Sequence, residues 1–72
     1  MNYNVSVFDR TGDSQFSFGD VGEAVAFVKD QLSGGNRWAY AGGQVMPSAD
    51  SVTVERLEGV TDIQVADAVV GG

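Results

Sequence analysis

The sequence contains no cysteine and no histidine and only one proline, so several devices that stabilise small proteins are missing. Without cysteine no disulfide bond forms, and without both residue types the usual ligands of structural zinc are absent. A chain of 72 residues buries only about 60% of the surface that its unfolded form exposes. We therefore expect one domain, residues 1–72, without a metal or cofactor, that is stabilised by ordinary packing and in part by self-association, such as a homodimer.

Basic residues are scarce: the sequence has only Lys29, Arg10, Arg37 and Arg56. With ten acidic residues the formal net charge is −6. Proteins that bind nucleic acid neutralise phosphates with clustered lysine and arginine, so direct binding to DNA or RNA is not expected. An acidic surface instead favours a basic protein partner. No run approaches the roughly 20 apolar residues of a membrane span, and residues 1–10 do not resemble a signal peptide. A cytoplasmic protein is expected.

Side chains suited to catalysis are equally few. Histidine, the commonest general acid or base, is absent, and Lys29 is the single lysine that could activate a serine or threonine. The pairs Asp9 with Asp13 and Asp62 with Asp67 do not have the spacing of a calcium-binding loop. The sequence therefore predicts no catalytic residue and no metal site, and we expect a protein that is not an enzyme.

The clearest element is a helix within residues 20–35, DVGEAVAFVKDQLSGG. Asp20 and Glu23 have the spacing of a capping box at its start, and Gly34 or Gly35 provides the left-handed residue that ends a helix. Its apolar residues fall on one stripe, with Phe27 at the border: Val21, Ala24, Val25, Val28 and Leu32. Such a short helix requires packing against another element, and a sheet is expected.

Strands are predicted on both sides of this helix from alternating apolar residues. The predicted pairs are residues 3–8 with 14–18, residues 37–41 with 44–46 across Gly42-Gly43, and Ser51–Leu57 with Val60–Val65. The fold class is therefore α+β, with one helix on an antiparallel or mixed sheet and the order ββαβ(β)ββ. At least one exposed sheet edge is expected, and such an edge is also a potential docking site.

Half of the carboxylates lie in residues 50–72, where Arg56 is the only basic residue; they are Asp50, Glu55, Glu58, Asp62 and Asp67. In the predicted last hairpin, Glu55 and Asp62 project from one face and Glu58 lies at the tip. Carboxylates at strand spacing imitate the charge of a nucleic-acid backbone, which predicts binding to a basic groove. Trp38 and Tyr40 share a face of their strand and are either an aromatic anchor for a partner or part of the core.

A very short, acidic, cysteine-free chain with a hairpin, one E-A-V-A-F-V helix and further strands resembles the small phage-encoded anti-CRISPR and anti-defence proteins. The resemblance implies a non-enzymatic inhibitor that occupies the nucleic-acid-binding surface of a bacterial defence complex. It also implies a location in the host cytoplasm. The acidic residues named above are the candidates for that contact.

A second resemblance concerns Val69-Val70-Gly71-Gly72 and an element order compatible with a β-grasp. These features resemble the ubiquitin-like sulfur carriers, and the stretch Ala41–Pro47 is similar to the N-G-x-x-V-P hairpin of that family. The resemblance implies that Gly71 and Gly72 are functional, because the terminal Gly-Gly of those carriers is adenylated and converted to a thiocarboxylate. Those carriers have a looser segment where a strand is predicted over Ser51–Leu57.

Overall fold

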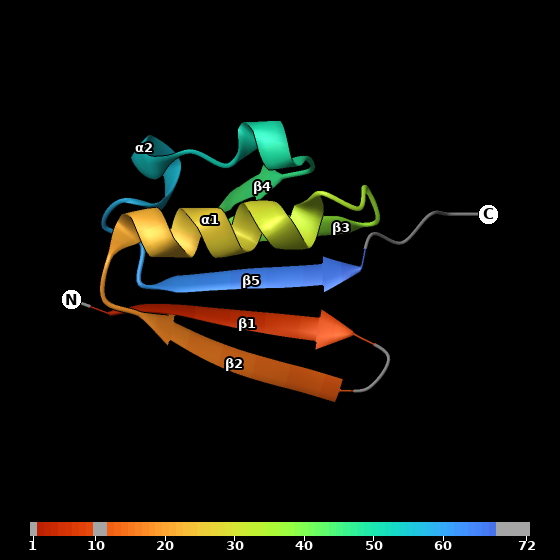
Figure 1. The fold of residues 1–72 in the computed structure, drawn as a ribbon, viewed down its shortest axis with the longest axis horizontal. Helices are drawn as coiled ribbons and strands as arrows, with labels where there is room; N and C mark the ends of the chain where they lie inside the picture. The colour runs from red at the N-terminus through yellow and green to blue at the C-terminus, as the bar shows by residue number, and fades with distance from the viewer. Residues whose placement is uncertain (1, 10–11, 68–72) are drawn as a thin grey trace.

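The structure, a computed structural model, describes residues 2–9 and 12–67. In this part of the chain the elements follow the order β1 (Tyr3–Asp9), β2 (Gly12–Phe18), α1 (Val21–Leu32), β3 (Arg37–Ala41), β4 (Gln44–Met46), η1 (Ala49–Ser51), α2 (Val54–Leu57) and β5 (Asp62–Asp67). The predicted α+β class is confirmed, with α1 lying across one face of the sheet (Figure 1). None of the described helices has the length and apolar character that crossing a membrane requires.

The described strands form one mixed sheet in the order β2-β1-β5-β3-β4. β5 lies in the middle, parallel to β1 and antiparallel to β3, while the two outer pairs are antiparallel hairpins. A parallel pair requires a long connection, and the segment from β2 to α2 provides it between β1 and β5. The sheet therefore has two edges, β2 and β4, and the last strand is held on both sides.

Helix α1 begins and ends as the sequence predicts. The side chain of Asp20 accepts a hydrogen bond from the backbone amide of Glu23 (3.2 Å), so the N-cap is confirmed. At the other end Gly35 has a positive φ of 78°, and its amide donates to the carbonyl of Leu32 (3.0 Å). The predicted apolar stripe faces the sheet, with Ala24, Val25, Val28 and Leu32 buried.

The core lies between α1 and the sheet. Strands β1 and β5 contribute Tyr3, Val5, Val7, Ile63 and Val65, which are all buried, and β3 contributes the small residues Ala39 and Ala41. Above strand β2 the ring of Phe27 packs on those of Phe16 and Phe18, with centroid distances of 4.6 and 5.2 Å. The predicted first hairpin is thus confirmed, although Phe16 stays 40% exposed.

The second hairpin is also confirmed. Gly42 and Gly43 have φ angles of 57° and 80°, as the two central residues of a type I′ turn require. Residues with a Cβ are strained in this conformation, which explains why two consecutive glycines occupy the turn.

The strand predicted over Ser51–Leu57 is wrong. This segment contains the end of η1, two extended residues and the single-turn helix α2. The hydroxyl of Thr53 accepts a hydrogen bond from the amide of Arg56 (3.2 Å), and this N-cap begins a helix where the alternation V-T-V-E suggested a strand. The helix turns Leu57 into the core, where it is fully buried together with Val52.

The hairpin between Ser51–Leu57 and Val60–Val65 is therefore wrong as well. The last strand begins two residues later than predicted, at Asp62, and pairs with β1 and β3. Gly59, with φ of 82°, turns the chain from α2 toward this strand.

Candidate functional site

The face of the sheet turned away from α1, which we call the open face, carries the largest group of exposed apolar side chains among the described residues. Ala39 and Ala41 are buried beneath α1, so the alternation of a strand places Trp38 and Tyr40 on the open face. Both aromatic side chains are 38% exposed. The interpretation of Trp38 and Tyr40 as core residues is therefore wrong, and they lie where a partner could contact them.

The strand register shows that these aromatics have apolar neighbours. Ala66 pairs with Phe8 on one side and with Trp38 on the other, which puts the three residues in one row across β1, β5 and β3. In another row Tyr40 pairs with Val45 of β4. Trp38 and Tyr40 are two residues apart on β3 and point to the same face, so the two rows are adjacent. We call these residues the open-face patch: Phe8, Trp38, Tyr40, Val45 and Ala66.

The sequence prediction missed three members of this patch, Ala66 and the large residues Phe8 and Val45, which are 41% and 47% exposed. A signal for Phe8 was present, since it occupies an outward position in a strand whose inward positions are Tyr3, Val5 and Val7. A large apolar residue on the polar side of an alternating strand indicates either an interface or a second covered face.

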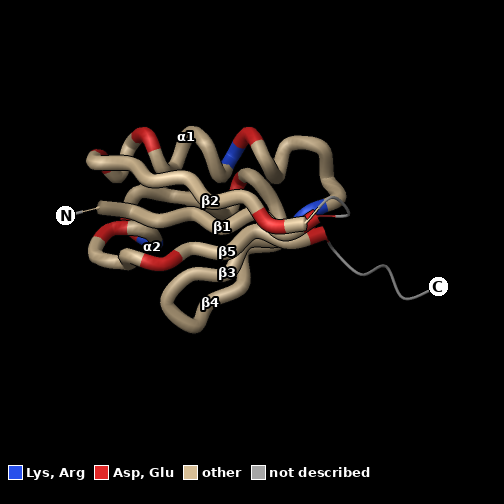
Figure 2. The backbone as a smooth tube through the Cα atoms, turned by 90° about the horizontal axis from the view of Figure 1, so that it is seen from below, with Lys and Arg blue, Asp and Glu red and all other residues tan. Residues whose placement is uncertain are grey.

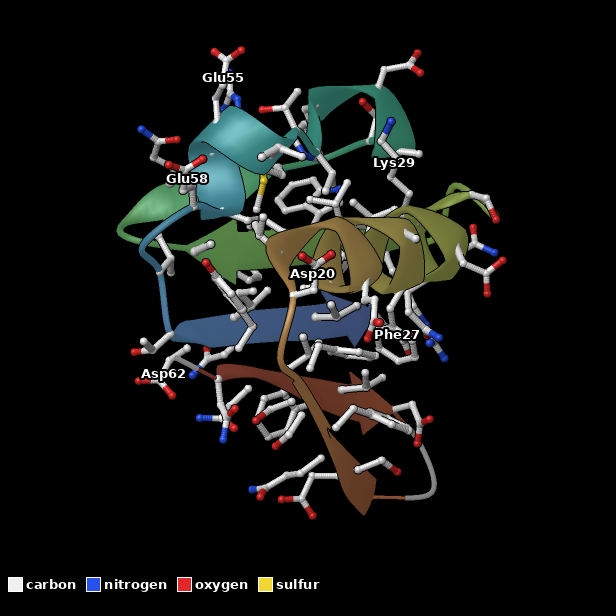
Figure 3. All side chains as sticks on the ribbon, turned by 60° about the vertical axis from the view of Figure 1, so that its left-hand side comes forward. Asp20, Phe27, Lys29, Glu55, Glu58 and Asp62 are labelled. Atoms are coloured by element: carbon white, nitrogen blue, oxygen red, sulfur yellow. The ribbon has the colours of Figure 1, made fainter. Side chains whose placement is uncertain are left out.

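The carboxylates predicted to form one acidic row are distributed over the molecule. Figure 3 shows Glu55 on α2, Glu58 directly after this helix and Asp62 at the beginning of β5, all toward the same end of the molecule. Asp50 lies in η1, and Asp67 lies at the opposite end of β5 from Asp62. Figure 2 shows acidic positions near both ends of the sheet and along α1. The predicted single row of five carboxylates is therefore wrong. Three of them, Glu55, Glu58 and Asp62, lie toward one end of the molecule.

Asp67, one of the carboxylates predicted to contact a partner, forms an ion pair with Arg37. Its Oδ1 atom accepts a hydrogen bond from Nε of Arg37 at 3.2 Å, and Nη2 of Arg37 lies 3.7 Å from Oδ2 of Asp9. Arg37 also donates from Nη1 to Oε1 of Gln31 on α1. This guanidinium therefore ties the end of β5 to β1, β3 and α1, and it neutralises part of the charge predicted to face a partner.

The predicted tail residues Gly71 and Gly72 lie outside the described residues. The described chain ends with Asp67, next to Ala66 of the open-face patch. No pocket is found among the described residues, and no group of three or more acidic side chains there is arranged to hold a metal ion.

Searches of protein-family models, of curated proteins and of solved structures found no match to this chain.

Proposed function

We propose that this protein is a ubiquitin-like carrier, whose Gly71-Gly72 pair is activated by a partner enzyme that adenylates carboxylates. The observation that carries the proposal is the sheet order β2-β1-β5-β3-β4, with β5 central and parallel to β1 and with α1 across one face. This is the arrangement of a β-grasp, the fold of the carriers that the sequence resembles. The short helix α2 also removes the departure from that family at Ser51–Leu57.

The position of β5 supports the same function. Residues 68–70 separate its last residue, Asp67, from the glycine pair. Five extended residues span at most roughly 17 Å. An enzyme bound to the open-face patch can therefore receive Gly72 if its active site lies within that distance of the end of β5. Glycine suits such a tail because it has no Cβ and passes through a narrow channel.

The chemistry concerns the carboxylate of Gly72, whether the chain ends there or is cut after it. A carboxylate oxygen forms a bond to the α-phosphorus of ATP, which is held by the enzyme, and pyrophosphate leaves. Sulfide then attacks the acyl carbon to give a thiocarboxylate, or an enzyme thiol attacks it to give a thioester that a lysine amine opens with loss of the thiol. In either case AMP leaves with the electron pair of the broken bond. The carrier contributes the acyl group and the docking surface, while the catalytic groups belong to the enzyme.

The test uses the protein with an N-terminal affinity tag, expressed in its own host, and compares it with a variant that lacks Gly72. We expect capture of an adenylating enzyme by the intact protein. Mass spectrometry of the intact chain is expected to show the replacement of one oxygen by sulfur, or an isopeptide bond from Gly72 to a lysine. Equal recovery of all partners by the shortened variant, together with an unmodified Gly72, would contradict the carrier function.

An acidic inhibitor of the anti-CRISPR type is the second proposal. The observation that favours it is the group of Glu55, Glu58 and Asp62 at one end of the molecule (Figure 3). Replacing all three with lysine is expected to abolish binding to a basic, nucleic-acid-handling complex, and the affinity of the unaltered protein is expected to fall steeply with salt. If the affinity for the captured complex does not change with salt, this second proposal is wrong.

A further inference from the structure

The open face carries little charge, although the chain as a whole has a formal net charge of −6. Helices η1 and α2 pack against α1, so they lie on the other side of the sheet. Besides the open-face patch, the described strands place five uncharged polar side chains and two carboxylates on this face: Asn4, Ser6, Gln15, Ser17, Gln64, Asp13 and Asp62. Exposed aromatics with few charges are typical of the centre of a protein interface.

The distribution of charge favours a second copy of this chain as the occupant of the open face. Two copies that are both acidic repel each other when they meet through α1 or α2, because Glu23 and Asp30 lie on α1 and Glu55 lies on α2. The two carboxylates of the open face lie away from its centre, with Asp13 on the edge strand β2 and Asp62 at the beginning of β5. Two copies therefore meet the least repulsion through this face.

The strand order makes the open face self-complementary. Two sheets packed face to face keep their strands within about 30° of each other. A twofold axis along the central strand β5 places β3 of one copy over β1 of the other, because these strands flank β5 on its two sides. Ala66 then meets Ala66 of the second copy on the axis, and Trp38 faces Phe8 of the second copy in both directions. The small alanines leave space for the aromatic rings beside them.

The next row of the sheet fits the same axis. Gln64 pairs with Ser6 on one side and with Tyr40 on the other. On the axis Gln64 meets Gln64 of the second copy, and a primary amide complements its equivalent because it both donates and accepts hydrogen bonds. Tyr40 faces the small Ser6 of the second copy. One contact is unfavourable, since Asp62 also lies on β5 and meets its own equivalent near the rim.

An axis perpendicular to the strands gives a poorer match. It places Ala66 of one copy over Asp62 of the other, so a carboxylate would be buried against the open-face patch without a cation. The arrangement along β5 keeps the apolar row together and leaves the Asp62 pair at the rim, where water reaches it.

The size of the face sets the strength of the contact. Five strands about 4.8 Å apart and roughly 20 Å long cover at most roughly 480 Å² per copy, or about 1,000 Å² for two. Stable protein interfaces bury about 1,200–2,000 Å², and smaller ones belong to weak, reversible complexes. The area therefore corresponds to a dimer with a dissociation constant of roughly 10–500 μM.

We propose that two copies of this chain associate through their open faces about a twofold axis along β5, in a weak dimer that salt strengthens. Salt acts in this direction because it screens the repulsion between two negatively charged copies. The activating enzyme of the proposed carrier function uses the same face, so it binds the monomer. The dimer itself does not rest on that function and is tested without the enzyme.

Self-association can be measured on the full chain by sedimentation equilibrium between 5 μM and 1 mM. We expect the average mass to rise from that of a monomer toward that of a dimer, and the dissociation constant to fall at least roughly threefold between 20 and 500 mM sodium chloride. On dilution of the protein labelled with nitrogen-15, the largest amide shifts are expected in β1, β5 and β3. A monomer at 1 mM and high salt, or shifts that are largest in α1, would overturn the proposal.

Two pairs of variants with equal net charge locate the axis. Gln64→Glu places two carboxylates on it and is expected to weaken the dimer at least roughly tenfold, whereas Gln44→Glu, on the α1 side of β4, is expected to change the dissociation constant less than twofold. Asp62→Asn removes the unfavourable pair and is expected to tighten the dimer roughly threefold or more, a gain that misfolding cannot produce. Asp30→Asn on α1 is its control, and equal effects of the two members of either pair would overturn the proposed axis.

Discussion

Because residues 54–57 form helix α2 and not the strand predicted from the sequence, two apolar residues of this turn are expected to contribute differently to stability. Leu57 is fully buried, whereas Val54 is 42% exposed. In the strand interpretation, Val52 and Val54 would share the inner face, so Val54 would contribute to the core. We therefore expect that replacing Leu57 with alanine destabilises the protein strongly and that replacing Val54 with alanine does not.

The magnitude follows from burial. A buried leucine replaced by alanine costs about 2–5 kcal/mol, because apolar contacts are lost and a cavity remains. A domain of 72 residues has a free energy of unfolding of roughly 4–11 kcal/mol, so Leu57→Ala removes a large part of it. For a loss of about 3 kcal/mol the Tm falls by roughly 12–24 °C. Val54→Ala is expected to stay within about 0.5 kcal/mol of the parent, since alanine also has the higher helix propensity.

The assay is urea unfolding followed by fluorescence and circular dichroism. Trp38, the single tryptophan, lies on β3 and reports on the sheet rather than on the mutated turn. The slope of the free energy against urea should stay the same in both variants, which would show that only stability has changed. A cost for Val54→Ala equal to that of Leu57→Ala would refute the helical assignment of this segment.

Three further predictions concern other parts of the molecule. Asp20→Ala removes the acceptor of the Glu23 amide and is expected to cost about 1 kcal/mol of unfolding free energy in urea titrations, while Asp20→Asn should retain most of that stability. Trp38→Ser combined with Tyr40→Ser should lower affinity for the activating enzyme of the proposed function at least roughly tenfold, with the fold retained by circular dichroism, because both side chains lie on the open face and are 38% exposed. Arg37→Met should cost about 1 kcal/mol at low salt and less in 1 M sodium chloride, since ion pairs that are partly open to solvent are weak and screened.

The elements that the sequence predicted correctly carry their own local signals. Helix α1 has a capping residue, a stripe with a period of 3.6 residues and a glycine end, and the second hairpin has two glycines at its turn. Each signal acts between residues that are close in the chain, so it does not depend on the rest of the fold. The same is true of the alternation in β1, where three inward residues are buried.

The segment Ser51–Leu57 lacks such a unique signal. Short apolar patterns fit a strand and a single helical turn equally well, and here tertiary packing decides between them. Val52 and Leu57 both reach the core only if the chain turns between them, and the N-cap at Thr53 makes that turn. The spatial arrangement of the carboxylates depended on this segment, which is why the predicted acidic row is not found.

The sequence left the two faces of β3 open for a different reason. Its alternation is clear, but hydrophobicity alone suggests that the large aromatic residues face inward and the alanines outward. A helix that lies close to a sheet requires small side chains beneath it, and Ala39 and Ala41 meet this requirement. The choice between a partner anchor and a core position for Trp38 and Tyr40 could therefore be made only after the position of α1 was known.

The proposed carrier function makes a prediction about the position of the open-face patch, which lies beside Asp67 at the end of the described chain. Phe8, Ala66 and Trp38 form the row of the patch at the C-terminal end of β5, and Arg37 fixes that end through Asp67. A partner bound to the patch thus holds the beginning of the tail in a fixed position. Attachment of this kind makes the encounter of Gly72 with the partner's active site intramolecular, so a short tail gives an effective concentration in the millimolar range. Inserting a flexible glycine and serine segment after Asp67 should therefore slow modification of Gly72 while leaving the affinity of the patch unchanged.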